Sequence, residues 1–582
     1  MRNILLALVL LLCITSSCKK DFLDSKPKGK LSDALLNTPD GIEALCISAY
    51  SALAGPEGSD GTFLSPTTNW IYGDVRAETA YKGGGGIGDL SEYHAFETFT
   101  GVFATNGLLD RKWFNLYSSV QRANSAIRNL NAVTEAQVPL KNIRLGEMRF
   151  LRAHYFFELS RLYNRIPYFD ENVAITDYVK ISNTQFTRDQ ILEKIASEFE
   201  AAAQLLPVTQ PQPGRATKYA AIAYQAKVTL YRAYKQNDDN TLASVDQGLL
   251  NKVESLTAEV VNNGGYSLLD DFQKLSQAEF DNSKESIFAV QYSISDGTAA
   301  GRINWSNLLN APRGPAYSGD GFFLPSQNLV NSYKTDANGL AMPDAYNTGN
   351  VMTVSDGLAT NVDPRLDFTV GRPGVRWKNF TASVYGPDWS REPATYGYYS
   401  NKKALVSPES PFMVKGFPWG GSALNFTIIR YADVLLWRAE ALIELGRPLE
   451  AVPLINQVRT RAKNSKYVLA WNNVSSTDYA AKYMVNTYQP GVNCVWSADY
   501  ARKALRFERK LELAMEGERF FDLVRWGIAE PVLNQEYMAK EKLLRTYYQN
   551  AKFTKGKDEY FPIPQPQINF SGGLYKQNPG YL

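Results

Sequence analysis

The chain has 582 residues, enough for two or three hydrophobic cores or for one continuous helical array. Its 62 Lys and Arg against 59 Asp and Glu give a net charge of +3 without a basic block, which excludes the electrostatic footprint of a nucleic-acid-binding protein. Only two histidines are present, so we expect neither a histidine-based metal site nor a cofactor.

The first residues have the pattern of an export signal. A basic residue precedes an unbroken apolar run, Ile4 to Ile14, that is too short to span a bilayer comfortably. The small residues before Cys18 resemble the lipobox of bacterial lipoproteins, although Thr15 stands where leucine is usual. We therefore expect a signal peptide at 1–17, lipidation of Cys18, and a polar lipidated tether at 18–40. Ordinary cleavage that leaves the cysteine unmodified is the alternative.

Residues 41–295 predict paired helices joined by short turns. Apolar residues recur at helical spacing, and capping motifs mark two helix starts, Thr38-Pro39 and Thr187 with Gln190. The predicted helices cover 39–53, 109–127, 144–163, 188–206, 216–234 and 253–260, and a short strand is expected at 285–293.

Helical periodicity disappears between residues 296 and 422, where Gly, Pro, Asn and aromatic residues dominate. A long segment without regular elements inside a compact protein is usually functional, and its many large rings argue against disorder. Rigid amphipathic rings on loops suit the binding of sugars or peptides. Packing of each ring against the helical body is the alternative. The candidate ligand-binding residues, from this segment and from the loop-rich stretch 55–101, are Trp70, Tyr72, Tyr81, Trp305, Trp389 and Tyr396.

Residues 425–463 predict a helical hairpin. Helix formers are broken once, at residues 445–448, where Gly446 suits a helix end and Pro448 a helix start. The unit resembles a tetratricopeptide repeat of about 34 residues, which buries its faces only when other helices stack on it. A helical pair in an unrelated all-α protein is the alternative. The apolar residues at spacings of three and four are Ile428, Tyr431, Leu435, Ala439 and Leu442, then Leu449, Val452, Ile455 and Val458.

A final helix is predicted from Ala501 to Trp526. Its Glu508, Glu512 and Glu516 share one face, so cations must lie nearby to offset the repulsion. This column favours an ion-pair seam over the acid and base of a glycosidase, which would face each other across a cleft of about 5 to 9.5 Å. The candidate cations, in this helix or on a neighbour, are Arg502, Arg506, Arg509, Arg519 and Arg525.

Five stretches in order behind the lipobox resemble the RagB/SusD family of nutrient-uptake outer-membrane lipoproteins. They are FLRAHYFFELSRLYNRIPYF (150–169), GRATKYAAIAYQAKVTLYRA (214–233), NFTIIRYADVLLWRAEALIELGR (425–447), RFERKLELAMEGERFFDLVRWG (506–527) and YFPIPQPQINFSGGLYKQNPGY (560–581). The likeness covers nearly the whole mature chain and is weakest over 296–422.

The resemblance implies a mainly α fold with little β structure. Tetratricopeptide-like hairpins would form an α/α superhelical body on which the loop-rich, aromatic-rich region packs. An N-terminal SusD-like helical region would span 41–295, and a C-terminal RagB/SusD region would span 296–582, with a loop-rich part at 296–422 and a helical part at 425–530, all in one compact body.

The resemblance also implies a carbohydrate-binding protein that is not an enzyme. A surface-exposed lipoprotein, anchored in the outer membrane and facing outside, would bind an oligosaccharide or polysaccharide and deliver it to a SusC-like TonB-dependent transporter. Capture of peptides by the same architecture is one alternative. The others are a helical glycoside hydrolase, for which Glu516 and Asp74 are the carboxylates to test, and an assembly scaffold.

Overall fold

The computed structural model describes residues 33–55, 62–297, 302–314, 316–380, 385–471 and 477–581. The signal peptide, Cys18 and the tether as far as residue 32 lie outside these ranges. Within them helices dominate, and the strands pair only two by two, which confirms the mainly α fold with little β structure. None of the helices described in these ranges is long and apolar enough to cross a bilayer.

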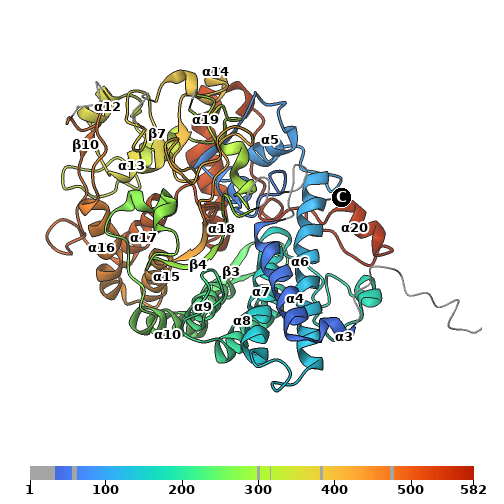
Figure 1. The fold of residues 1–582 in the computed structure, drawn as a ribbon. Coiled ribbons are helices and arrows are strands. Elements are labelled where there is room, and N and C mark those ends of the chain that lie inside the picture. Colours follow the sequence, from blue (N-terminus) through green and yellow to red (C-terminus); the bar gives the residue numbers. More distant parts are fainter. Residues whose placement is uncertain are drawn as a thin grey trace, which may run out of the picture.

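The N-terminal half is an array of antiparallel helices. Figure 1 shows α4 and α6 to α10 following one another in an arc, which α15 and α16 continue, whereas α5 lies apart from it near α19. The capping residues act as predicted, since Thr38 caps α4 and Thr187 forms a capping box with Gln190 at α8. The helices are α3 (Asp33–Leu36), α4 (Pro39–Ser51), α5 (Ser91–Thr98), α6 (Gly107–Ala132), α7 (Lys141–Tyr163), α8 (Arg188–Leu205), α9 (Lys218–Ala233) and α10 (Gln247–Asn263).

The hairpin of the C-terminal half consists of α15 (Tyr431–Glu444) and α16 (Pro448–Asn464). Gly446 joins them with a φ of 76°, a conformation that glycine adopts without strain. The prediction that Ile428 lies on a helix face is wrong: Phe426–Arg430 forms strand β9, which pairs antiparallel with β4 (Ser286–Val290). Its β-branched residues and the partner strand favour extended backbone over a longer helix.

The predicted final helix is two helices, α17 (Ala498–Leu513) and α18 (Arg519–Arg525). The helix is interrupted at Met515 and Gly517, whose φ values are 63° and 83°. The π-helix η2 (Trp70–Asp74) packs against this break so closely that a Cβ on Gly73 would lie 1.8 Å from the Gly517 carbonyl oxygen. The break therefore provides the space in which a segment from the other end of the chain packs.

The predicted ion-pair seam of the three glutamates is confirmed, but the proposed cations are wrong. Glu508 and Glu512 both accept from Arg365, at 2.7 and 2.9 Å, and Glu516 accepts from Arg430 at 2.9 Å. The other cations of the seam are Lys403, Arg459 and Arg461. The arginines near the glutamates in sequence point to other sides: Arg502 pairs with Glu444, Arg509 with Asp522, Arg519 with Glu78 and Arg525 with Glu440, and Arg506 lies over the Trp526 ring.

The described part of the loop-rich region contains only short elements, many of them drawn in yellow at the top of Figure 1. It has its own core of aromatic rings around Trp377 and Trp389. Strand β1 (Ala80–Gly83) pairs antiparallel with β5 (Phe322–Pro325), so the two loop-rich stretches of the sequence lie side by side. Other elements here are η6 (Trp305–Asn310), α11 (Gln327–Ser332), α12 (Val354–Ala359), β6 (Asn361–Val362), α13 (Arg365–Thr369), β7 (Val370–Gly371), η7 (Pro387–Trp389), α14 (Pro393–Tyr396) and β8 (Ser400–Asn401).

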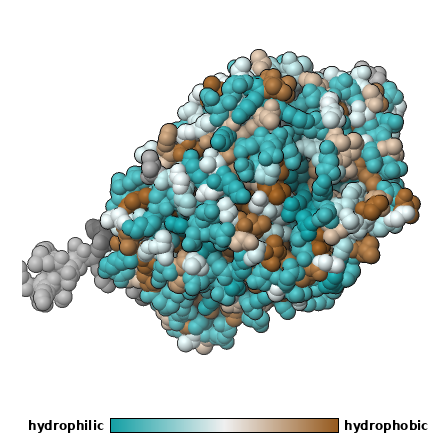
Figure 2. Space-filling view, turned by 180° about the vertical axis from the view of Figure 1, so that it is seen from behind, coloured by the Kyte–Doolittle hydropathy of each residue, from teal (hydrophilic) through white to brown (hydrophobic). Residues whose placement is uncertain are grey.

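The chain after α18 wraps back over the N-terminal helices. Its elements are the π-helix η8 (Pro531–Met538), α19 (Ala539–Leu544) and α20 (Gln565–Phe570), and α20 lies against α6. The remaining strands are β2 (Tyr234–Gln236), β3 (Leu242–Val245) and β10 (Lys482–Tyr483). The face in Figure 2 is mainly hydrophilic, and its hydrophobic residues form small separate groups.

Candidate functional site

The structure buries five of the six aromatic residues predicted to bind ligand. Trp70, Tyr72, Tyr81, Trp389 and Tyr396 each expose 1% of their surface or less, whereas Trp305 is partly exposed. Burial of a large aromatic ring removes much apolar surface from water and stabilises the fold. Loops that pack on a helical body therefore direct many of their rings inward. The five buried rings therefore lie inside the protein in this structure, where Trp70 also lines a small cavity of about 70 Å³.

Two of the buried rings hold the segment that carries Trp305. The indole nitrogen of Trp70 donates to the carbonyl oxygen of Ser306 at 3.1 Å. The carbonyl oxygen of Trp389 accepts from the backbone N–H of Arg313 at 2.9 Å, and its ring packs so closely on Gly314 that a Cβ there would lie 2.5 Å away. These contacts fix residues 305–314 on the core beneath them.

Exposed rings occur on the neighbouring turn. Phe417 and Trp419 expose 72% and 47% of their surface. Their turn is closed by a hydrogen bond from the Val414 N–H to the Gly421 carbonyl, and it packs against residues 303–311, since the Asn304 N–H donates to the Ser422 carbonyl at 2.9 Å. We call Trp305, Phe417 and Trp419 the aromatic surface.

Sequence reasoning missed Phe417 and Trp419. The available signal was the sequence Gly-Phe-Pro-Trp-Gly-Gly at 416–421, because rings set among glycine and proline lie on a turn whose tip has few neighbours to bury them. Polar groups adjoin the rings: Arg313 and Lys415 are exposed on the same two segments, and Asn307 is partly exposed. The aromatic surface thus combines ring faces with hydrogen-bond donors.

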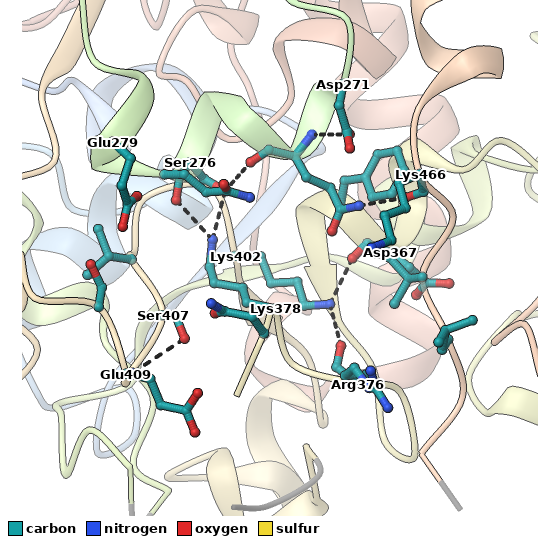
Figure 3. A pocket seen from close by; sticks show the side chains of 18 of the residues that line it. Asp271, Ser276, Glu279, Asp367, Arg376, Lys378, Lys402, Ser407, Glu409 and Lys466 are labelled. Atoms are coloured by element: carbon teal, nitrogen blue, oxygen red, sulfur yellow. Dashed lines mark hydrogen bonds between the residues drawn. The ribbon is translucent and has the colours of Figure 1, made fainter. Parts of the chain in front are cut away.

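A separate pocket of about 350 Å³ lies between four segments of the chain (Figure 3). Its walls come from residues 271–279, 367–379, 402–411 and 466–469, and no residue of the aromatic surface lines it. Lys378 and Lys402 cross its floor. The Lys402 ammonium donates to the Asp367 and Arg376 carbonyl oxygens at 2.8 and 3.0 Å, and burial lowers its pKa to about 8.

The carboxylates that a glycosidase would need are engaged in structural contacts. Burial acts to raise the pKa of Glu516, but Arg430 and Lys403 outweigh it and hold that pKa below the usual range. Burial raises the pKa of Asp74 to about 7, and its carboxylate accepts from the Gly517 N–H at 2.6 Å. Among the residues described, no group of three or more His, Cys, Asp or Glu side chains could hold a metal ion.

The chain matches two family models that together span most of its length. Residues 284–581 match the model described as the SusD family, and residues 21–230 match one described as starch-binding associating with outer membrane. SusD-like protein P2 of Formosa agariphila is 25% identical over 487 residues, which is 82% of this chain and 81% of the relative. A SusD-like protein of Bacteroides ovatus is 24% identical over 549 residues, 90% of this chain and 83% of the relative.

Solved structures share the fold. A SusD homolog from Bacteroides thetaiotaomicron superposes with a TM-score of 0.69 at 19% identity, covering 94% of this chain and 98% of its own. Surface glycan-binding protein A from the same species, in complex with laminarihexaose, gives a TM-score of 0.64 at 21% identity, covering 93% of this chain and 99% of its own. Because a family model matches more than half of its residues, the chain belongs to the SusD family.

Proposed function

We propose that this protein binds an oligosaccharide or polysaccharide at the aromatic surface and delivers it to a SusC-like TonB-dependent transporter. The observation that carries the proposal is the exposure of Phe417 and Trp419 on a turn that rests against a buried aromatic core. Flat rings bury the apolar faces of sugar units, and nearby polar groups fix their orientation. The backbone of the turn is held by its own hydrogen bond and by that to Asn304, so binding has to order little of it.

The comparisons support this choice of ligand. The solved structure of surface glycan-binding protein A, which has the same fold, is a complex with laminarihexaose. No bond is broken in the proposed role, because the protein only has to hold the glycan and release it. Glu516 and Asp74 remain in structural contacts and are not used as acid and base.

The proposed location is the outer membrane, with the protein anchored by lipid on Cys18 and facing outside. The description of the model matched by residues 21–230, which mentions association with the outer membrane, supports this location. The short apolar segment before Cys18 supports export and lipidation. The anchor predicts that a Cys18→Ala variant loses its membrane attachment, and a variant that stays in the washed membrane fraction would contradict it.

The glycan proposal predicts which rings matter for binding. Titration of the protein lacking residues 1–18 with laminarin, starch, xylan and other neutral polysaccharides should give saturable heat with at least one of them. Trp419→Ala and Trp305→Ala should each weaken that binding by tenfold or more, about 1.4 kcal/mol, because each removes a stacking face. Tryptophan fluorescence and calorimetry measure the effect.

The control is Phe570→Ala, which removes a ring exposed by 73% on α20, outside the aromatic surface. It should leave glycan affinity unchanged. Full affinity in both tryptophan variants would contradict the proposed site. Binding of peptide digests alone would replace the glycan by a peptide ligand, and binding of neither class would favour an assembly scaffold.

A further inference from the structure

The pocket of Figure 3 is an open hollow with a lining that differs from the aromatic surface. Its volume of about 350 Å³ falls at the lower end of the range for small-molecule sites, which suits a single sugar unit. Four segments that are distant in sequence converge on it, and most of its lining residues are polar or charged. It shares no residue with the aromatic surface, so it can be tested independently.

Two lysines at the floor have neutral hydrogen-bond partners. Lys378 is half-buried, and its ammonium donates to the hydroxyl of Ser276 at 2.7 Å and to the carbonyl oxygen of the same residue. Lys402 exposes 2% of its surface and donates to two backbone carbonyl oxygens. Figure 3 shows both side chains crossing the pocket with their ammonium groups directed toward different walls.

The acidic side chains that line the pocket act on these lysines only at a distance, Asp367 on Lys402 and Glu279 on Lys378. Asp367 is the buried carboxylate, and Arg372 already binds it with two hydrogen bonds of 2.8 Å while the Tyr483 hydroxyl donates at 2.6 Å. The side chains of Glu279 and Glu409 are exposed at the rim. The lining as a whole carries four acidic and four basic side chains, and the hydrogen bonds described for Lys378 and Lys402 go to hydroxyl and carbonyl oxygens and not to carboxylates.

Buried lysines of this protein have two arrangements: Lys82, Lys112 and Lys334 donate to backbone carbonyl oxygens as Lys402 does, whereas Lys227, Lys403 and Lys510 pair with a carboxylate. Lys402 differs from the first three in lining this pocket. The carboxylate in the second arrangement offsets the cost of removing the ammonium charge from water. Burial lowers the pKa of Lys402 and of Lys378, and an anion bound between them would oppose that shift.

We propose that this pocket binds the carboxylate of an acidic sugar unit, with Lys378 and Lys402 as its cationic partners. Ser407 and Asn379 offer polar groups for the sugar hydroxyls. Tyr467, which is partly exposed, lines the pocket and adjoins the exposed Tyr479 ring at 5.6 Å, so an aromatic wall is present beside the charged floor. A uronic acid has this combination of one carboxylate, several hydroxyls and an apolar ring face.

The test compares D-glucuronate with D-glucose, which differ by the carboxylate. Calorimetric titration and ligand-observed magnetic resonance of the purified protein should show saturable binding of glucuronate and at least tenfold weaker binding of glucose. Lys378→Gln and Lys402→Gln should each weaken glucuronate binding tenfold or more. Lys141→Gln is the matched control, because this half-buried lysine of α7 also donates to a carbonyl oxygen, that of Val133 at 2.7 Å, but does not line the pocket.

Other outcomes of this test either leave the proposal to Lys378 alone or overturn it. If Lys402→Gln fails to fold, as judged by circular dichroism, the half-buried Lys378 carries the test alone. Equal binding of glucose and glucuronate, no binding of glucuronate, or unchanged affinity in Lys378→Gln would overturn the proposal. Trp419→Ala should leave glucuronate binding intact, so failure of the aromatic surface as a glycan site and failure of this pocket as a carboxylate site give different results.

Discussion

Aromatic residues of the loop-rich region have two separate roles at the scale of single residues. Trp389 lies in a cluster with Trp377 and Tyr385, with ring centroids 5.3 and 5.1 Å apart, and stabilises the loops from within. Trp419 lies on a turn with almost half of its surface exposed. The same residue type in the same kind of sequence thus serves either packing or recognition, depending on which neighbours cover it.

This difference predicts opposite effects on stability. Trp389→Ala should lower the free energy of unfolding by about 3 to 5 kcal/mol, because it removes a large buried ring and leaves a cavity. Trp419→Ala should change it by less than about 0.5 kcal/mol, as expected for an exposed side chain. Guanidinium titration followed by circular dichroism measures both. Equal stability of the two variants would contradict the assigned roles.

At the scale of an element, α17 illustrates how tertiary contacts allow an unfavourable helix surface. Glu508 and Glu512 lie one turn apart and are fully buried, an arrangement that destabilises an isolated helix. Arginines from α13, β9 and α16 surround them and satisfy both carboxylates. The seam therefore ties α17 to three elements that are distant from it in the sequence.

Removal of one charge from this seam should be costly. Glu512→Gln leaves Arg365, Arg430 and Arg461 without their common carboxylate, so we expect a loss of about 3 to 5 kcal/mol in unfolding free energy. Denaturant titration measures the loss. Glu450→Gln is the control, since Glu450 pairs with Arg447 on the exposed start of α16. The melting temperature of this variant should equal that of the wild type. A similar melting temperature for Glu512→Gln would refute the stabilising role of the seam.

At the scale of the whole molecule, buried carboxylates fall into two groups with opposite pKa shifts. Burial acts to raise the pKa of Glu78 and Asp522, but neighbouring arginines outweigh it and lower both values to about 2. Burial raises the pKa of Asp74 and Asp281 to about 7, since their partners are mainly hydrogen-bond donors and not cations. The two groups make opposite contributions to the dependence of stability on pH.

The directions of these pKa shifts predict that the free energy of unfolding is greatest at acidic pH. Unfolded carboxyls have pKa values of about 4, so Glu78 and Asp522 contribute stability above that pH and lose it as the pH falls toward 2. Asp74 and Asp281 contribute stability below about pH 4 and lose it as the pH rises through 7. Unfolding free energies measured from pH 2.5 to 8 should therefore peak near pH 4, about the pKa of the unfolded carboxyls.

An Asp281→Asn variant isolates one of these groups. Its amide keeps an oxygen that can accept from the Asn425 N–H, the contact that the carboxylate makes at 3.0 Å, but it does not titrate. The decrease in stability between pH 5 and 8 should be smaller in this variant than in the wild type. An unchanged slope over that range would show that Asp281 does not contribute to it.

Local sequence alone determined most of the helical framework. The caps at Thr38 and Thr187, the break at Gly446 and the apolar spacing of each helix act within a few residues, so they could be interpreted without the fold. The family resemblance could be found in the sequence for the same reason, because it rests on five short stretches. Tertiary structure alone decided that Phe426–Arg430 is a strand, that Glu512 meets Arg430 and Arg461, and that Trp419 and not Trp389 faces water. These outcomes depend on which distant segments cover a side chain, and burial of that kind arises only when the whole chain has packed.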